Sequence, residues 1–305
     1  MSAVQSPLAA ERGSVSPGVR RITLDADGTT LSALLAEPRH TPPRAVVVAL
    51  HGGGMRAGYF DGQAHPELSL LSLGARLGYT VLAPDRPGYG HSAAGLPEGQ
   101  HLAQQCETLR AALGDFAARH DTGAGLFLLA HSYGGTLALT TAAGPHGDTL
   151  LGLDVSGCGH RFAPGTAAHS TARRHGNWKL NWGPLRLYPD NTFISSGALV
   201  TPMPVRERED APRWPERFRE LAHRVTVPTR LTFAEHEKWW RHDDAALAEL
   251  AALLANTPRT VIDRHAGAGH NISLGHAARA YHLKALAFLE ECMAHRGAAR
   301  PARAS

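Results

Sequence analysis

Residues 126–136 read LFLLAHSYGGT, an apolar run that gives way to polar residues and two glycines. The apolar run at 126–129 is typical of a strand buried on both faces, and Gly134 and Gly135 mark its abrupt end. Ser132 stands between the run and the glycines. A buried strand that ends in a sharp turn at a serine is either an ordinary strand-to-helix connection or a device that exposes a nucleophile.

Strands and helices alternate on both sides of this stretch. The hydrophobic pattern predicts a first pair of strands at 19–25 and 29–38, joined by the turn sequence DADG into a hairpin. Further strands are predicted at 44–54, 79–85, 150–157, 227–235 and 259–265, and helices at 65–77, 99–119, directly after Ser132, at 243–255 and at 276–295. This alternation predicts an α/β fold with a mostly parallel, doubly wound sheet.

One long stretch without strand periodicity interrupts the alternation between the sixth and seventh core strands. Residues 158–226 are rich in His, Arg, Pro and Trp, and these 69 residues are too many for a plain loop in a compact domain. We therefore expect an inserted cap at 158–226 on a core built from 19–157 and 227–296. The ends, 1–18 and 297–305, are expected to be disordered tails.

Composition excludes several classes of function. Hydrophobic residues make up 43% and charged residues 19% of 305 residues, as in folded globular proteins. The N-terminal segment has no signal-peptide core and no run approaches the roughly 20 apolar residues of a membrane span, so we expect a cytoplasmic protein without a membrane partner. The net charge of +4 includes no basic run, which argues against binding of nucleic acid.

Motifs for metals and cofactors are absent from the sequence. Cys106, Cys158 and Cys292 are far apart and form no CxxC pair, so neither a disulfide framework nor a zinc site is indicated. The 19 histidines are scattered and HExxH does not occur. Neither GxGxxG nor GxxxxGK[ST] is present, so no nucleotide cofactor is expected.

The segment around Ser132 resembles the nucleophile elbow of the α/β-hydrolase family, which is usually GxSxG. Here it reads Ala130-His131-Ser132-Tyr133-Gly134, with alanine in place of the first glycine. Alanine is the least disruptive departure, because strand and helix pass close to each other at this position. The resemblance extends from about residue 19 to residue 295. It implies an α/β-hydrolase fold in which Ser132 is the nucleophile.

A glycine-rich segment follows the third predicted strand, where this family places its oxyanion loop. It reads His51-Gly52-Gly53-Gly54. The resemblance implies that the backbone amide of Gly53 or Gly54, with that of Tyr133, holds the oxygen that becomes negative in a tetrahedral intermediate. The alternative is a merely flexible glycine turn.

The resemblance also implies a general base and an acid. AGAGHNIS at 266–273 follows the last predicted strand, and His270 matches the position of the family's catalytic histidine. Glu237 occupies the position of the acid, in a pattern where the family usually has Gly and Asp. Asp154 and Glu235 stay open as alternative acids.

Another segment, APDRPGYGHS at 83–92, resembles the family's D-x-R-G-x-G-x-S sequence with Pro87 inserted at the R-G step. A structural role is expected for Asp85 and Arg86, which would tie down a loop beneath the site.

Aromatic residues of the predicted cap and of the segment after Glu237 are candidates for substrate binding. They are Trp178, Trp182, Tyr188 and Trp239. They could line an apolar pocket or form the cap's own core. The predicted cap has a net charge of +5, which either attracts an anionic substrate or is only a solvated arginine-rich surface.

Together these features predict a cofactor-independent serine hydrolase that cleaves a carboxylic ester, thioester or lactone through an acyl-enzyme. Its expected partner is a small-molecule acyl substrate, with a carrier-bound thioester as one option. A non-hydrolytic lyase, acyltransferase or cyclase of secondary metabolism is the alternative, and a ligand-binding receptor on the same scaffold is a third. The oligomeric state stays open.

Overall fold

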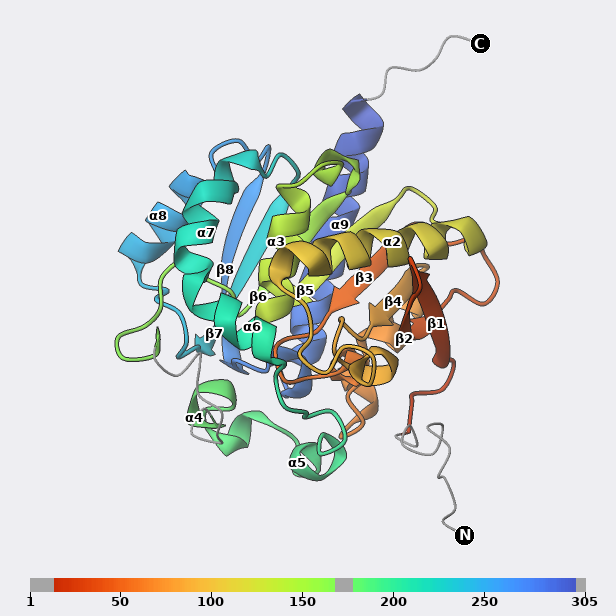
Figure 1. Ribbon diagram of the computed structural model, residues 1–305, viewed down its shortest axis with the longest axis horizontal. Coiled ribbons are helices and arrows are strands. Elements are labelled where there is room, and N and C mark those ends of the chain that lie inside the picture. Colours follow the sequence, from red (N-terminus) through yellow and green to blue (C-terminus); the bar gives the residue numbers. More distant parts are fainter. Residues whose placement is uncertain (1–13, 168–177, 300–305) are drawn as a thin grey trace.

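The computed structural model describes residues 14–167 and 178–299. Eight strands form one sheet in the order β1-β2-β4-β3-β5-β6-β7-β8 (Figure 1). The strands are β1 (Arg20–Ala26), β2 (Thr29–Ala36), β3 (Val46–Leu50), β4 (Thr80–Pro84), β5 (Leu126–His131), β6 (Gly152–Ser156), β7 (Thr229–His236) and β8 (Thr260–Gly269). The predicted strand at 44–54 is therefore shorter, and the last strand continues to the residue before His270.

Strand directions agree with the predicted sheet. β1 and β2 pair antiparallel as a hairpin, and β2 also pairs antiparallel with β4. From β4 through β3 to β8, all neighbours are parallel. The mostly parallel α/β-hydrolase architecture expected from the sequence is confirmed.

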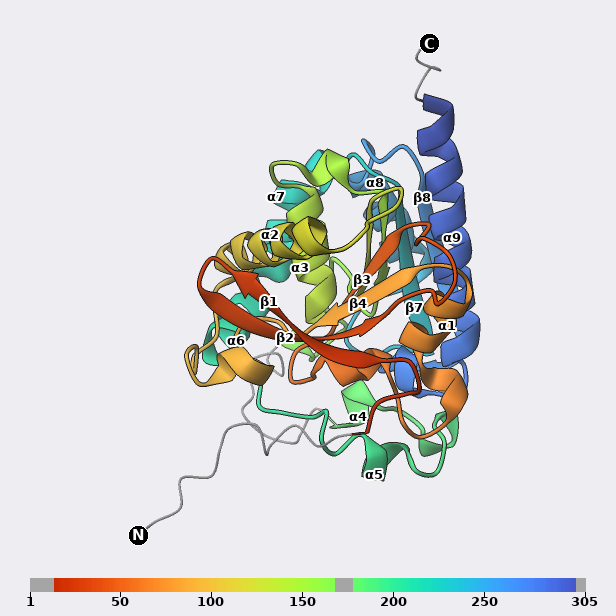
Figure 2. The same cartoon turned by 90° about the vertical axis from the view of Figure 1, so that its right-hand side faces the viewer.

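Helices cover both faces of the sheet. In the described residues, the α-helices are α1 (Leu70–Arg76), α2 (Leu102–Arg119), α3 (Tyr133–Ala142), α4 (Trp178–Asn181), α5 (Thr192–Ser195), α6 (Val205–Asp210), α7 (Trp214–Leu221), α8 (Asp244–Leu253) and α9 (Ala278–Ala299). Figure 2 shows α1 and α9 on one side of the sheet and α2, α3 and α7 on the other. Among the described residues, no helix combines the length and apolar character that crossing a membrane requires.

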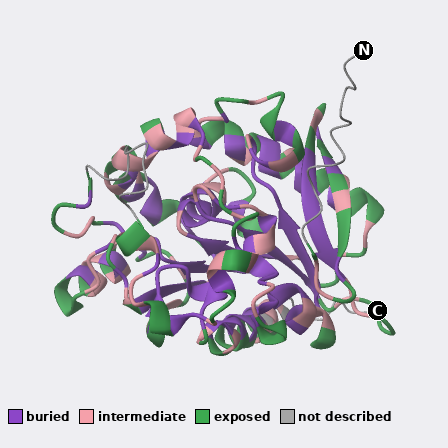
Figure 3. Ribbon diagram, turned by 90° about the horizontal axis from the view of Figure 1, so that it is seen from below, coloured by how far each residue is buried: buried purple, intermediate pink, exposed green. Residues whose placement is uncertain are grey.

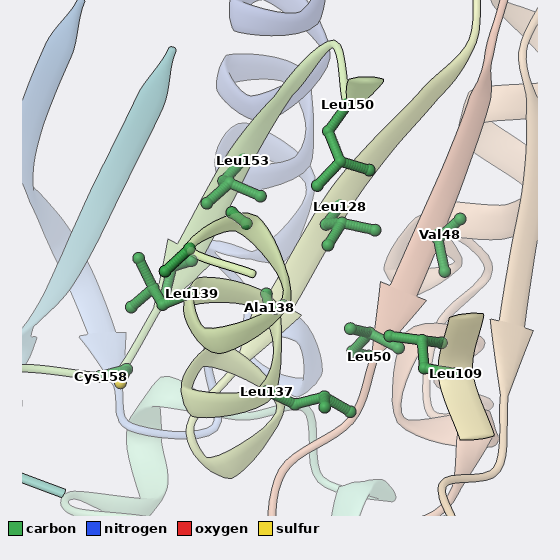
Figure 4. Close-up of a cluster of buried hydrophobic side chains, with 14 of the residues drawn as sticks. Val48, Leu50, Leu109, Leu128, Leu137, Ala138, Leu139, Leu150, Leu153 and Cys158 are labelled. Carbon is green, nitrogen blue, oxygen red and sulfur yellow. The ribbon is translucent and has the colours of Figure 1, made fainter. Parts of the chain in front are cut away.

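Alternation along each central strand explains how one sheet carries two hydrophobic layers. In β3, Val46, Val48 and Leu50 belong to the cluster under α2 and α3, whereas Val47 and Ala49 belong to the cluster under α1 and α9. Successive side chains of a strand point to opposite faces, so a continuous apolar run suits a strand covered on both. Figure 4 shows the first layer packed around α3, and Figure 3 shows the buried strands inside more exposed helices.

The long insertion lies between β6 and β7, as predicted, and its parts lie in different places. α4 and α5 lie beyond the carboxyl ends of the parallel strands (Figures 1 and 2). In contrast, Trp214, Phe218 and Leu221 of α7 pack in the same core cluster as β6 and β7. The later part of the predicted cap is thus a core helix layer, while residues 168–177 of it lie outside the described residues.

Candidate active site

Three polar residues meet at the edge of the sheet where the parallel strands end. Ser132 directly follows β5, Glu237 directly follows β7 and His270 directly follows β8. His270 Nε2 lies 3.1 Å from Ser132 Oγ, and His270 Nδ1 lies 2.7 Å from Glu237 Oε2. Because the carboxyl ends of parallel strands share one edge, residues 138 positions apart in the chain come within hydrogen-bond distance.

The backbone at Ser132 is held in an unusual conformation. Its φ of 52° and ψ of −119° lie outside the regions that non-glycine residues normally adopt. The turn requires close approach of neighbouring chain segments: a Cβ placed on Gly134 would lie 2.2 Å from the Leu50 carbonyl oxygen. The Ser132 amide donates to the Ser156 carbonyl at 2.8 Å, which fixes the turn against β6. The strain at Ser132 is therefore maintained by packing on both sides.

The tautomer of His270 follows from its partners. An ionised carboxylate can only accept hydrogen bonds, so Nδ1 of His270 donates to Glu237. Nε2 is then free to accept the hydroxyl proton of Ser132. Gly157 packs against the ring, since a Cβ there would lie 2.9 Å from His270 Cε1. The orientation of the imidazole ring and its tautomer are thus both fixed.

Glu237 is fully buried and still ionised. Burial raises the pKa of its carboxyl. The charge and hydrogen bond of His270 and the hydrogen bond from the Trp239 amide lower this pKa by more than burial raises it, so the net pKa lies below the ordinary range. Its Oε1 accepts the backbone amides of Lys238 at 2.9 Å and Trp239 at 2.8 Å. Each carboxylate oxygen therefore has a partner, which makes a buried charge tolerable.

The glycine segment after β3 includes a backbone amide without an acceptor among the described residues. The Gly53 and Tyr133 amides have no hydrogen-bond acceptor among the residues that the structure describes. The Gly54 amide, in contrast, donates to the Tyr89 hydroxyl at 2.9 Å. Of the two glycines considered from the sequence, Gly53 is thus the one with an available donor.

A buried network of charged and polar side chains holds this glycine segment in place. Arg86 donates to the carbonyl oxygen of His51 at 2.8 Å and of Gly52 at 3.2 Å, and forms a buried ion pair with Glu207 of α6. The Tyr89 hydroxyl donates to the same glutamate at 2.7 Å. These contacts agree with the structural role expected for Arg86, which holds the backbone after β3. Nothing in the sequence singled out Glu207 as its ion-pair partner.

The alternative acids lie elsewhere. Asp154 is buried in β6, where it pairs with Arg230 at 2.5 Å and accepts the Tyr281 hydroxyl at 2.8 Å. Glu235 is exposed and accepts the Gly267 amide at 2.8 Å. Neither carboxylate has a hydrogen bond to His270 among the described contacts, whereas Glu237 has one.

Ser132 and Tyr133 line a cavity of about 520 Å³. Trp178, Trp182 and Trp239 line it too, so three of the four aromatic candidates lie at this cavity. Tyr188 does not belong to this lining, because its ring packs against Trp182 at 5.2 Å between ring centroids. Sequence patterns did not single out the other side chains that line the cavity, which include Phe162, Met203, Arg208 and Trp214.

A larger surface hollow of about 880 Å³ contains Glu237 and Trp240 but not Ser132. It is lined by charged residues such as Arg241, Asp243 and Arg264. Within 14–167 and 178–299, no group of His, Cys, Asp or Glu side chains could hold a metal ion.

The sequence model of the alpha/beta hydrolase family matches residues 47–282. The chain belongs to this family. A comparison with curated protein sequences found no match.

Solved structures with the same fold include three enzymes at low sequence identity. A thermostable carboxyl esterase from Bacillus coagulans is 17% identical, with a TM-score of 0.68, over 91% of this chain and 100% of the esterase. A monoglyceride lipase from Saccharomyces cerevisiae is 15% identical, with a TM-score of 0.68, over 95% of this chain and 98% of the lipase. An enol-lactonase from Burkholderia xenovorans LB400 is 19% identical, with a TM-score of 0.65, over 88% of this chain and 100% of the lactonase.

Proposed function

We propose that the protein is a serine hydrolase that cleaves a carboxylic ester, thioester or lactone through an acyl-enzyme. The observation that carries the proposal is the chain of contacts from Ser132 Oγ through His270 to Glu237, which opens on the cavity of about 520 Å³. A serine hydroxyl is a weak nucleophile unless an adjacent base removes its proton. His270 is in position to do so.

In the first step, Ser132 Oγ attacks the substrate carbonyl carbon and its proton passes to His270 Nε2. The imidazolium that forms is stabilised by the ionised carboxylate of Glu237 at 2.7 Å. The negative charge that develops on the carbonyl oxygen is held by the amides of Gly53 and Tyr133. These two amides are suited to this because neither has another acceptor among the described residues.

In the second step, the tetrahedral intermediate collapses and His270 gives its proton to the departing alcohol or thiol. The acyl group then stays on Ser132. A water molecule, deprotonated by His270, attacks the acyl carbon and releases the carboxylic acid. For a lactone, the departing hydroxyl remains attached to the acyl group.

The cavity favours a substrate with an apolar part. Trp178, Trp182 and Trp239 lie in its walls with Phe162 and Met203. A cavity of this volume is in the range that encloses a small organic molecule. The carboxyl esterase, the monoglyceride lipase and the enol-lactonase that share the fold are named for the cleavage of ester or lactone bonds.

The proposal is tested by hydrolysis of a panel of nitrophenyl esters, simple lactones and acyl thioesters. We expect Ser132→Ala and His270→Gln each to reduce kcat/KM by about 10³-fold or more, since nucleophile and base act as a unit. Circular dichroism of both variants controls for folding. Turnover that survives in Ser132→Ala but not in His270→Gln would contradict the acyl-enzyme and favour a lyase or another non-hydrolytic reaction.

A further inference from the structure

Arg208 stands out in the wall of the cavity that contains Ser132. It is the single Arg, Lys or His among the described lining residues, and no Asp or Glu accompanies it there. The guanidinium Nη1 donates to the backbone carbonyl of Met203, which also lines the cavity. This contact holds the guanidinium at the cavity wall.

The other charged side chains of α6 that are not fully exposed all have ion-pair partners. Arg206 pairs with Glu98 at 3.2 Å, Glu207 pairs with Arg86, and Asp210 pairs with Arg217 at 2.9 Å. Arg208 has no carboxylate partner in the described part of the chain, and its Met203 contact uses only one nitrogen. Its Nε and Nη2 are thus left without an acceptor.

A half-buried guanidinium beside aromatic side chains loses water without gaining a counter-charge. Such a group is stabilised by a carboxylate that approaches its free edge, because Nε and Nη2 match the two carboxylate oxygens in spacing and direction. The cavity supplies one positive charge. A monoanion would therefore be neutralised there, whereas the second charge of a dianion would stay uncompensated in an apolar environment.

We infer that the substrate carries a carboxylate in addition to the bond that is cleaved, and that Arg208 binds this carboxylate. The inference rests on the proposed function for its reaction, but its binding step does not depend on turnover. The expected substrate class is a half-ester, a carboxylated thioester or a carboxylated lactone. The aromatic walls would contact the carbon chain that joins the two ends.

Turnover tests the inference through substrate discrimination. Nitrophenyl butyrate is compared with nitrophenyl hemisuccinate, whose carboxylate is on the acyl side, and with butyryloxybenzoate, whose carboxylate is on the leaving group. We expect kcat/KM for one anionic ester, relative to the neutral ester, to fall roughly 10- to 100-fold in Arg208→Gln. Arg206→Gln, which removes the same charge from α6 at the Glu98 pair, is expected to keep the wild-type ratio.

Binding tests the same inference without chemistry. Calorimetry on Ser132→Ala measures N-phenylsuccinamic acid against the neutral N-phenylbutanamide, with and without the Arg208→Gln change. We expect the acid to bind more tightly and the preference to fall roughly 10- to 100-fold without Arg208. Equal affinities in both proteins, or no binding of the acid, would overturn the role of Arg208. Preferential binding without any turnover would retain that role and refute the proposed hydrolysis instead.

Discussion

At the scale of single residues, the serine turn depends on the absence of a side chain at Gly134. A Cβ at this position would lie 2.2 Å from the carbonyl oxygen of Leu50 and 2.7 Å from that of His51. Backbone atoms on a central strand cannot move aside without disturbing the sheet. A small residue two positions after Ser132 is therefore a packing requirement of the turn.

Gly134→Ala should lower the free energy of unfolding by at least about 2 kcal/mol, because it overpacks a rigid contact. Gly114→Ala is a matched control, since Gly114 lies on the exposed side of α2 with nothing near its Cβ position. This control should raise stability by about 0.5–1 kcal/mol through helix propensity. Urea unfolding measures both. Equal effects of the two variants would show that the close approach at β3 does not matter.

Single substitutions also test which carboxylate acts as the partner of His270. Glu237→Gln should lower kcat by about 10²- to 10⁴-fold, because the imidazolium loses its counter-charge and the preferred tautomer of His270 is no longer fixed. Asp154→Asn should instead act on stability, since Asp154 is paired with Arg230 and Tyr281. Steady-state kinetics on folded protein separates the two. A larger loss of kcat in Asp154→Asn would reverse the assignment.

Short motifs were sufficient to predict that Ser132 and His270 come together, because each lies at a strand end with glycines beside it. The acid was harder to identify from the sequence, because Glu235, Glu237 and Asp154 all lie on or next to strands. Only the contacts around His270 distinguish them. Arg208 could not be predicted to face the cavity, because sequence alone does not tell which side of a short cap helix is turned inward.

At the scale of elements, α6 connects the insertion to the glycine segment of the site. Its Glu207 reaches the core and pairs with Arg86, which holds the carbonyl oxygens of His51 and Gly52. Tyr89 joins the same glutamate to the Gly54 amide. The insertion thus fixes the backbone on which the proposed oxyanion donors depend.

Glu207→Ala should lower the free energy of unfolding by about 3–5 kcal/mol, because it leaves a buried arginine without its partner. We also expect kcat to fall by roughly 10- to 100-fold in the protein that remains folded, as the glycine segment loses its fixed position. Glu209→Ala, an exposed neighbour on α6, is the control and should change neither quantity appreciably. If the two variants behaved alike, α6 would not position the loop.

The core elements could be predicted from the sequence because buried parallel strands give continuous apolar runs such as Val46–Leu50. The insertion could not be divided in the same way. α7 is amphipathic and packs on the sheet, whereas α4 and α5 are single turns beyond the strand ends. The positions of α4 and α5 depend on tertiary contacts that leave no periodic signal in sequence.

At the scale of the whole molecule, buried histidines couple stability to pH. Burial lowers the pKa of His51 and His131 well below the ordinary value, aided by the charges of Arg86 and His270 respectively, and burial lowers the pKa of His282 to about 3. These groups stay neutral in the folded protein while the unfolded chain takes up protons below pH 6.5. The stability that these neutral histidines contribute is therefore fully present above pH 6.5 and is lost as the pH falls below it.

His282→Gln should reduce the slope of unfolding free energy against pH by about 1.4 kcal/mol per pH unit between pH 6 and pH 5. Glutamine does not titrate and can still bond to Ser273, which contacts His282 at 3.0 Å. His40→Gln changes an exposed histidine and should leave the slope as in the wild type. Urea titrations at several pH values give the slopes, and an unchanged slope in His282→Gln would contradict the coupling.

The proposed hydrolysis requires that Ser132 is an activated nucleophile. Intact-mass spectrometry after incubation with a small fluorophosphonate tests it most directly, because the attacking oxygen displaces fluoride and keeps the phosphonyl group. We expect a single adduct on the wild type, none on Ser132→Ala, and much slower labelling of His270→Gln. A folded wild-type protein that forms no adduct, or an equal adduct on Ser132→Ala, would contradict it.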